Sequence, residues 1–476
     1  MAFDQGLSGL NAAVQNLNVI GNNVANANTV GFKESQAQFA DVYANSLVGS
    51  GGLQVGSGTT VATVAQQFAQ GAITVTSNSM DMAINGNGFY RMDNNGTVTY
   101  SRNGQFQLDQ NGFMVNAQGL KLTGYPVSAT GAILPGNPAP LQMSAAPLAP
   151  KSTVNVTAGL NLNANATAPA TAVFNPLDPT SYNNSTSTTV YDSLGNSHVS
   201  TLYFQQQPLP LAPLGNASMA AGSSTMTLSG STAGLAAGDT LTVAGVTYTI
   251  SGVTNATTLT VTPATVAAVG PAAPTATNAP SGTWNTYLTV DGASVPALPA
   301  TLTTLTFNAS GTLASAPTAA ATFNPPGAAA QTLTFNFGST TQYGTAFGVN
   351  SLTQDGYTTG QLTGVNTSAN GIIVGSYTNG QTMSLGQVVL ANFSNPQGLQ
   401  PLSGNQWAQS ATSGAPLVGV PGSASLGVLQ SGAVESSNVD LTSELVNMIT
   451  AQRAYQANAQ TIKTQDQLTQ TLINLR

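Results

Sequence analysis

The sequence contains no cysteine and few charged residues. The lack of cysteine excludes disulfides, thiolate metal sites and a cysteine nucleophile. Charged residues make up 5% of the 476 positions, whereas a typical soluble domain has about 25%. No Lys or Arg stands between Lys151 and Arg453, so the middle of the chain has no cation for an Arg–carboxylate pair, a phosphate clamp or a nucleic-acid-binding face. We therefore expect no nucleic-acid partner.

Histidine and long apolar runs are also scarce. His198 is the only histidine, so a His-based metal site or a Ser-His-Asp triad has one possible centre. It follows a turn at the start of an expected strand, where a structural histidine is the simpler interpretation. We expect no catalytic, cofactor or metal site, and no enzyme activity. No apolar run approaches the roughly 20 residues of a membrane span, so we expect no membrane insertion.

The N-terminus also lacks the basic and apolar regions of a secretory signal peptide. If the protein leaves the cell, we expect export by a route that removes no leader.

Both ends of the chain carry the pattern of an amphipathic helix. Near the N-terminus, apolar residues alternate in steps of four and three, the period of a coiled coil: Phe3, Leu7, Leu10, Val14, Leu17 and Val24. Near the C-terminus, Asp440 is a candidate N-cap. A second seam follows it and shifts its phase after Ile462: Leu441, Leu445, Met448, Tyr455, Ile462, Leu468, Leu472 and Leu475.

Neither end has the residues to bury its seam against itself. Isolated helices of this length are marginal in water, so each seam needs a partner helix from the other terminus or from another molecule. Two helices that close the globular core of a single molecule are the alternative interpretation.

The region between the helices has the two-residue alternation of β-strands. Asn-Gly pairs at Asn95-Gly96, Asn103-Gly104 and Asn111-Gly112 predict the tight turns of an antiparallel meander, and residues 345–434 have a similar pattern. Residues 187–207 and 282–292 read as two strands that pair as a hairpin arm. Between them, residues 208–280 alternate Thr with Leu, Val, Met or Ile, which predicts an accessory β module; a disordered low-complexity linker is the alternative.

We therefore predict a mainly β fold with terminal α-helices, in which antiparallel β domains are nested between an N- and C-terminal coiled-coil pair. An out-and-back path would place the two helices side by side and antiparallel. The expected domains are a helical core (1–30 and 437–476), a connector (31–75), an inner β domain (76–146 and 345–436), and an outer β domain (147–344) that includes the 208–280 insert.

Residues 17–35, "LNVIGNNVANANTVGFKES", resemble the N-terminal signature of the bacterial flagellar rod and hook proteins, and residues 437–476 resemble their C-terminal signature. The ending "TIKTQDQLTQTLINLR" is similar to the hook members rather than the rod members. The resemblance covers roughly residues 1–145 and 335–476 and less of the middle. On this resemblance the N-terminal motif residues are Asn22, Asn23, Asn26, Gly31, Phe32 and Lys33, which would turn the chain out of the first helix.

The resemblance implies a structural subunit that polymerises with itself into the hook, a curved hollow tube that transmits motor torque to the filament as a universal joint. The terminal helices would form the innermost layer. The implied partners are the distal rod, the hook cap, the hook–filament junction proteins and the flagellar type III export apparatus, with an extracellular location in the flagellum.

Phe39 and Tyr43 resemble the spaced export signal of such subunits, although aromatics four residues apart also form packing pairs. The alternative functions are a distal rod protein, which would form a straight tube, and an extracellular β-rich adhesin or carbohydrate-active enzyme.

Overall fold

The computed structural model describes residues 2–42, 56–144, 146–208, 213–233, 235, 237–265, 267–277, 280–308 and 310–474. The chain divides into two compact units. The first unit contains Met1–Pro147 and Gln361–Arg476, and we call it the terminal unit because it is built from both ends of the chain. The second contains Leu148–Gly360 and is called the middle unit. The chain therefore leaves the terminal unit once and returns to it once.

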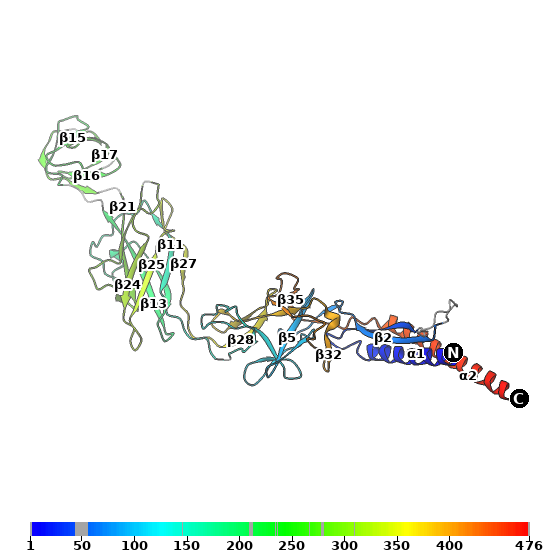
Figure 1. The fold of residues 1–476 in the computed structure, drawn as a ribbon. Helices are drawn as coiled ribbons and strands as arrows, with labels where there is room; N and C mark the ends of the chain where they lie inside the picture. Colours follow the sequence, from blue (N-terminus) through cyan, green and yellow to red (C-terminus); the bar gives the residue numbers. More distant parts are fainter. Residues whose placement is uncertain are drawn as a thin grey trace. The chain divides into compact units, whose positions relative to one another are not determined.

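Two α-helices, α1 (Ala2–Ala25) and α2 (Leu441–Asn474), pack against each other in the terminal unit (Figure 1). The predicted cap of the second helix is confirmed, because Asp440 Oδ1 accepts a hydrogen bond of 2.9 Å from the backbone N–H of Thr442. Gly6 lies against Ile462, and Asn23 lies against Glu444. The helices are therefore antiparallel, as predicted.

A β-hairpin of β1 (Ser35–Val42) and β2 (Gly58–Gln66) contacts α1 along its length. The sequence analysis assigned no strand to this part of the 31–75 connector. No side chain of β1 is buried, and Ala65 is the buried residue of β2. The hairpin therefore lacks the apolar alternation by which a half-buried strand is recognised in sequence.

The terminal unit contains a 13-stranded sheet in which strands from both ends of the chain are interleaved, with a main order of β28-β29-β30-β9-β5-β6-β33-β32. Its N-terminal strands are β5 (Phe89–Asn94), β6 (Thr97–Ser101), β7 (Gln107–Leu108), β8 (Met114–Val115), β9 (Lys121–Tyr125) and β10 (Ala139–Pro140). Its C-terminal strands are β28 (Leu362–Thr367), β29 (Ile372–Tyr377), β30 (Thr382–Val388), β31 (Leu390–Asn392), β32 (Gln400–Leu402), β33 (Gln406–Ala408) and β34 (Leu417–Gly419).

Two smaller sheets repeat this interleaving. In one, β3 (Ile73–Val75) pairs with β36 (Ala433–Glu435), and in the other β4 (Met82–Asn85) pairs with β35 (Val428–Ser431). A short 3₁₀ helix, η2 (Pro396–Gly398), precedes β32. Each of these N-terminal strands therefore has its partner more than 300 positions later in the sequence.

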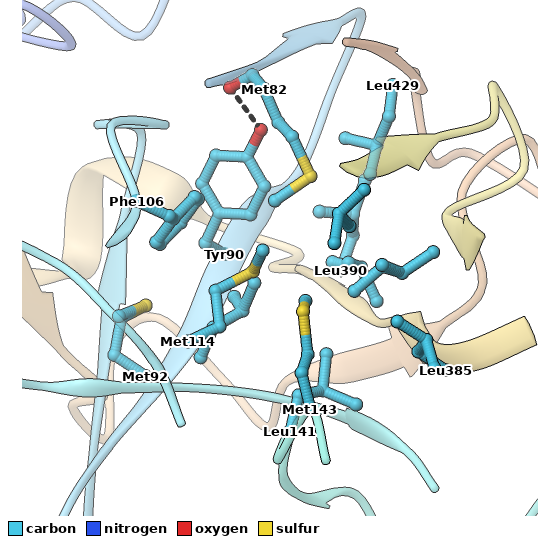
Figure 2. Packing of buried hydrophobic residues seen from close by; sticks show 14 of the residues in the cluster. Met82, Tyr90, Met92, Phe106, Met114, Leu141, Met143, Leu385, Leu390 and Leu429 are labelled. Atoms are coloured by element: carbon cyan, nitrogen blue, oxygen red, sulfur yellow. Dashed lines mark hydrogen bonds between the residues drawn. The ribbon is translucent and has the colours of Figure 1, made fainter. Parts of the chain in front are cut away.

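The main core of the terminal unit draws side chains from both ends of the chain, as Figure 2 shows. Met82 and Tyr90 come from the N-terminal strands, and Leu390 and Leu429 come from the C-terminal strands. The Tyr90 hydroxyl is fully buried and donates a 2.6 Å hydrogen bond to the carbonyl of Met82 (Figure 2). A second, aromatic cluster surrounds Trp407.

The middle unit has two five-stranded sheets around one core. The first sheet consists of β11 (Asn155–Asn163), β24 (Thr318–Phe323), β25 (Gln331–Asn336), β26 (Thr341–Tyr343) and β27 (Gly348–Gln354). The second consists of β12 (Asn184–Tyr191), β13 (Ser197–Pro208), β21 (Pro280–Val290), β22 (Ala293–Ser294) and β23 (Thr303–Thr306), and a short 3₁₀ helix, η1 (Pro179–Ser181), precedes it.

The predicted pairing of the two runs is confirmed, because β13 pairs antiparallel with β21. The first run, residues 187–207, was expected to be one strand, but it forms two, because β12 and β13 pair with each other as a hairpin. The chain returns to the terminal unit at Gln361 rather than at the expected residue 345, since β27 pairs with β11 along almost its whole length and so belongs to the middle unit.

A separate seven-stranded sheet lies between β13 and β21, in the order β19-β14-β15-β18-β17-β16-β20. Its strands are β14 (Ala217–Met219), β15 (Thr225–Leu228), β16 (Thr240–Val243), β17 (Val246–Asn255), β18 (Thr258–Thr262), β19 (Val269–Ala272) and β20 (Thr275–Thr277). Leu, Val, Met, Tyr and Ile side chains of these strands form their own core. The alternating Thr side chains on β15 to β18 lie on the opposite, more exposed face.

The mainly β fold with packed terminal helices is confirmed, but one predicted turn is wrong. Asn95-Gly96 and Asn111-Gly112 do form turns, and both glycines have positive φ. Asn103-Gly104 does not form a turn. Instead, the carbonyl oxygen of Met82 lies so close to Gly104 that no side chain fits between them, and the backbone N–H of Met82 donates to the Gly104 carbonyl at 2.9 Å. The glycine at this position allows the backbone of Met82 to approach closely and does not reverse the chain.

Candidate assembly site

The contact between α1 and α2 is made by small residues. A Cβ atom on Gly9 would lie 2.9 Å from the side-chain amide of Asn458, and one on Gly6 would lie 3.0 Å from Cγ1 of Ile462. Ala13 and Ala451 are buried further along the same contact. The sequence analysis missed these residues. Gly6, Gly9 and Ala13 are three and four positions apart, which is the spacing of one helix face. The sequence analysis followed the larger apolar side chains and overlooked this face.

The predicted seam of α1 remains largely open to solvent in the single chain. Phe3, Leu7 and Val14 are 48%, 43% and 36% exposed, and Leu10, Leu17 and Val24 are partly buried. Residues advance by about 100° around an α-helix, so this seam lies about a quarter turn away from the small residues that face α2.

The third side of α1 faces the β1–β2 hairpin. The hydroxyl of Ser8 accepts a hydrogen bond of 3.3 Å from the backbone N–H of Thr59, and Ala12 is buried. By the same rotation of about 100° per residue, this side and the predicted seam lie on opposite flanks of the α2 contact. The hairpin therefore covers one groove of the helix pair and leaves the other groove uncovered by the described residues.

The predicted seam of α2 is divided between two environments. Met448 and Ile462 are partly buried on the side of α1. Leu441, Leu445 and Leu468 are 46%, 45% and 58% exposed, and Tyr455 is 37% exposed. Leu472 belongs to the helix, and Leu475 lies outside the described residues. The exposed residues Val446, Ile449 and Ile473 were missed because they fall between the positions of the heptad pattern.

Five of the exposed residues, three on α1 and two on α2, lie on the same side of the pair. In each helix they are rotated from the contact by about a quarter turn toward increasing residue number, and the antiparallel arrangement brings these two rotations to the same flank. We call this surface the open face. It consists of Phe3, Leu7, Val14, Leu441 and Leu445.

The asparagine-rich motif forms the end of α1 and its connection to the hairpin. Asn23 is buried, and its side chain makes two hydrogen bonds to the backbone of Ser35. Its Nδ2 donates to the Ser35 carbonyl at 2.8 Å, and its Oδ1 accepts from the Ser35 N–H at 3.0 Å. Asn26 Nδ2 donates to the carbonyl of Asn22 at 3.0 Å, and Asn26 Oδ1 accepts from the Thr29 hydroxyl at 3.1 Å. These side chains satisfy backbone groups at the helix end and tie it to the adjacent strand.

Gly31 and Lys33 fasten this motif to the C-terminal part of the chain. Gly31 has φ +71° and donates its N–H to the carbonyl of Glu435 at 2.8 Å. Lys33 Nζ lies 2.6 Å from Glu435 Oε1 and donates to the carbonyl of Ala69 at 2.7 Å. Phe32 between them is half-buried. The motif therefore anchors α1 to a carboxylate 402 positions away.

Arg102 completes a buried ionic cluster with Lys33 and Glu435. Its Nη1 lies 3.5 Å from Glu435 Oε2, and its Nη2 donates to the carbonyl of Gly86 at 2.8 Å. The side chains of all three charged residues are 4% exposed or less. Burial lowers the pKa of Lys33 and of Arg102, and the Glu435 carboxylate counteracts this in both. The cluster thus has two cations that share one buried carboxylate, a combination that no spacing in the sequence predicted.

A concentration of negative charge lies next to the start of α2. Glu34 and Glu444 are close enough to raise the pKa of Glu34, for which burial is the largest cause and the neighbouring Glu444 carboxyl the next. Glu444 itself is buried against Asn23.

Phe39 lies on the hairpin and is 43% exposed, whereas Tyr43 lies outside the described residues. The assignment of these two residues as an export signal therefore stays a prediction from sequence.

His198 has a structural environment in the middle unit. Its Nδ1 lies 2.6 Å from Asp291 Oδ2, and its Nε2 lies 3.4 Å from Asp192 Oδ2. Burial opposes the charged imidazole, but the hydrogen bonds to the two carboxyls outweigh burial and raise the pKa of His198. Across the described ranges, no group of three His, Cys, Asp or Glu residues is placed to hold a metal ion. Within the same ranges, no helix is long and apolar enough to span a membrane.

Four flagellar family models match the chain in sequence order. They are described as flagella basal body rod protein (residues 3–33), flagellar hook protein FlgE/F/G D1 domain (83–169), flagellar basal body protein FlaE D2 domain (161–278 and 252–357) and flagellar basal body rod FlgEFG protein C-terminal (430–475). The chain is 39% identical to the flagellar hook protein FlgE of Escherichia coli (strain K12) over 482 residues, which cover 100% of both chains.

The chain belongs to the flagellar hook protein FlgE family. It is equally similar, at 39% identity over 100% of both chains, to the family member of Salmonella typhimurium (strain LT2), and it is 30% identical to that of Rhizobium meliloti (strain 1021) over 99% of this chain and 98% of that one. As a member of this family, the protein is a structural component of the bacterial flagellum and not an enzyme. The similarity also extends through the middle unit, beyond the two end segments that the sequence motifs covered.

Proposed function

We propose that copies of this chain assemble with one another, through the open face of the helix pair, into the curved hollow tube of the hook. The observation that carries this proposal is the exposure of Phe3, Leu7, Val14, Leu441 and Leu445 on one side of two packed helices. Complete burial of an exposed side chain such as Leu or Phe contributes about 1.5–3 kcal/mol, and these five are 36–48% exposed in the single chain, so each can still gain roughly half of that or less. Five such side chains per copy, repeated along a lattice, can outweigh the entropy lost when the copies are ordered.

The geometry of growth follows from the proposed contacts between different surfaces. When one patch of a copy meets another patch of its neighbour and the rotation does not close, a helical tube grows without an enzyme. In this arrangement the terminal helices form the innermost layer and the β domains lie outside it. The few ion pairs of the middle unit, of which Lys151–Asp355 at 3.3 Å is one, suit outer contacts that slide as the tube bends.

The finer parts of the proposal concern location and partners. As a hook subunit, the chain is exported by the flagellar type III apparatus and acts outside the cell, where it transmits motor torque to the filament. Its tube contacts the distal rod at one end and the hook cap or the hook–filament junction proteins at the other. Phe39 and Tyr43 form the proposed export signal. Family membership supports these assignments.

A pair of neighbouring substitutions on α1 tests the proposal. Val14→Asp introduces a charge into the open face, whereas Gln15→Asp places the same charge on an exposed position about 100° away that faces neither α2 nor the open side. We expect both variants to remain folded monomers, and only Val14→Asp to lose tube formation in sedimentation and electron microscopy. Equal tube formation by both variants would exclude the open face as the assembly surface.

The shape of the tubes distinguishes the two flagellar functions. Short, curved tubes agree with a hook, whereas straight, rigid tubes would favour the distal rod protein.

A further inference from the structure

Two glutamates from opposite ends of the chain meet in a groove of the terminal unit. The groove lies between α1, β1 and α2 and has a volume of about 320 Å³. Glu34 and Glu444 are the charged residues among the described residues that line it, and the other lining residues are apolar or neutral polar. The side chains of the two glutamates are within hydrogen-bonding reach of each other. The two carboxyls therefore face each other across a groove whose described lining contains no cation.

Glu444 is the member of the pair that is placed to keep its negative charge. It lies in the first turn of α2, where the helix dipole favours a carboxylate. The residue is 4% exposed, and its two oxygens accept from the side-chain amides of Asn23 and Asn447, both at 3.5 Å. Hydrogen bonds of that length are weak. The buried carboxylate would therefore gain from a closer donor.

Glu34 is the member placed to act as that donor. Its backbone is fixed, because its N–H donates to Asn438 Oδ1 at 2.7 Å and its carbonyl accepts from the Gln67 N–H at 2.8 Å. Its residue is only partly buried, so the side chain can reach either the groove or water. Burial is the largest cause that raises the pKa of Glu34, followed by the Glu444 carboxyl and then by Asp440. All three causes favour a proton on Glu34.

The cations nearest to the pair do not neutralise it. Lys33 is adjacent to Glu34 in sequence, but its Nζ lies 2.6 Å from Glu435 Oε1 and donates to the carbonyl of Ala69. On α2, Arg453 is exposed and is not among the residues that line the groove. The described part of α1 contributes no charged residue to the lining.

We propose that a proton shared by Glu34 and Glu444 is a pH-dependent latch between the start of the β1–β2 hairpin and the first turn of α2. With the proton present, the Glu34 carboxyl donates to the Glu444 carboxylate and joins the two elements across the groove. When the proton is lost, two like charges face each other, and the Glu34 side chain turns to water while its backbone stays in place. The hairpin then loses a direct tie to α2. This inference concerns the single chain and does not rest on the proposed assembly.

The latch closes as pH falls. The folded-state pKa of Glu34 lies above its ordinary value of 4.5. Between these two values the folded chain binds more protons than the unfolded chain, so the free energy of unfolding of the terminal unit falls as pH rises. The stabilisation by the latch is present in full below 4.5 and is lost as pH rises through the folded-state pKa. A carboxylate in an ion pair gives the opposite sign, which makes the direction of the change diagnostic.

The sequence makes a direct titration of the pair possible. It contains three glutamates, Glu34, Glu435 and Glu444, so a chain labelled with ¹³C at the glutamate carboxyl gives three NMR signals. In a titration from about pH 4 to about pH 8, we expect the Glu34 signal to have its midpoint above 4.5. The Glu444 signal should move with the same midpoint, because interacting carboxyls titrate as a pair. In Glu444→Gln, the midpoint of Glu34 should fall.

Urea unfolding measures what the latch contributes. Trp407 is buried in the terminal unit, and its fluorescence reports on that unit when Trp284 of the middle unit is replaced by Phe. Glu34→Gln should keep the latch closed at every pH, because an uncharged amide can still donate to Glu444. Its folding equilibrium constant should match that of the parent near pH 4 and exceed it by about 2- to 10-fold near pH 8. Asp41→Asn, which removes the same charge from an exposed position of β1, should show no such gain.

Several results would overturn the inference. They are a Glu34 midpoint at or below 4.5, a midpoint that stays the same in Glu444→Gln, and a difference between Glu34→Gln and the parent that does not change with pH or that Asp41→Asn reproduces. If Glu444→Gln does not fold, Glu34→Gln gives the same test from the other side. The Glu444 signal should then lose the midpoint that it shares with Glu34, and its retention would exclude a shared proton.

Discussion

The buried cluster of Lys33, Arg102 and Glu435 makes a sharp prediction for Glu435→Gln. The substitution keeps the size of the side chain and an oxygen that can still accept from Gly71 N–H, which lies 2.9 Å from Oε1. It removes the one carboxylate that both cations share. Breaking a buried ion pair in this way costs about 3–5 kcal/mol, because a charge is left buried and unpaired. We expect a loss of this size from the free energy of unfolding of the terminal unit.

The two tryptophans allow this unit to be followed by itself. Trp407 is buried in the terminal unit, where its indole N–H donates to Gln66 Oε1 at 2.6 Å, and Trp284 is buried in the core of the middle unit. In a Trp284→Phe background, urea unfolding monitored by fluorescence reports on the terminal unit. With a slope of about 3 kcal/mol per M, the midpoint should fall by about 1 M or more, at an unchanged slope. Arg453→Gln, an exposed control on α2, should change the stability by less than about 0.5 kcal/mol.

Two further measurements separate charge from shape. Adding Lys33→Met to Glu435→Gln removes one uncompensated cation and should recover part of the loss. The loss should also shrink as pH rises toward the ordinary lysine pKa of 10.5. The folded-state pKa of Lys33 is already lowered by burial, and without Glu435 it falls further. At pH values between the folded-state pKa of Lys33 and its ordinary value, the unfolded chain binds more protons than the folded chain, so the free energy of unfolding rises with pH. A midpoint for Glu435→Gln at pH 7 equal to that of the parent would refute this account.

Three other predictions follow from the described contacts. Gly31→Ala should destabilise the terminal unit by more than about 1 kcal/mol in the same assay, because φ is +71° and the new Cβ would lie 2.6 Å from the backbone N of Asn103; Gly119→Ala, also at positive φ but in open space, measures the cost of φ alone. Asn23→Ala should cost about 1–3 kcal/mol by leaving both backbone groups of Ser35 without their partner, and a loss near zero would show that water replaces the amide. In the middle unit, the raised pKa of His198 stabilises the fold fully below 6.5, and this contribution is lost as pH rises through the folded-state pKa. Trp284 fluorescence in a Trp407→Phe background should record that loss, and His198→Gln should remove the pH dependence; a lone imidazole that titrates below 6.5 by NMR would contradict it.

Local patterns predicted the elements that depend on neighbouring residues. The helix starts and periods, the cap at Asp440 and the hairpin turns each rest on a few consecutive side chains, and the structure has them. Asn103-Gly104 shows the limit of such patterns, because the same dipeptide that favours a turn also permits the close approach of the Met82 backbone. The choice between these two roles depends on a strand about 20 residues earlier in the sequence.

The contacts that hold the terminal unit together could not be predicted from the sequence, and the reason is physical. Lys33 and Glu435 are 402 positions apart, and each would read as an ordinary surface charge in its own segment. The face by which α1 meets α2 was also missed, since Gly6, Gly9 and Ala13 carry little hydrophobic signal and permit close packing because they are small. Part of the predicted apolar seam, including Phe3, Leu7 and Leu445, is exposed in the single chain instead, and the proposed assembly depends on this exposure.

The interleaving of the two chain ends has a consequence for incomplete polypeptides. A product that stops anywhere between Gly360 and Gly427 contains every strand of the middle unit, so that unit can still form. The same product lacks α2, the strands that pair with β3 and β4, and the carboxylate that neutralises Lys33 and Arg102. A chain truncated during translation or by proteolysis therefore cannot take part in the proposed assembly, because its terminal unit does not fold without the C-terminal residues.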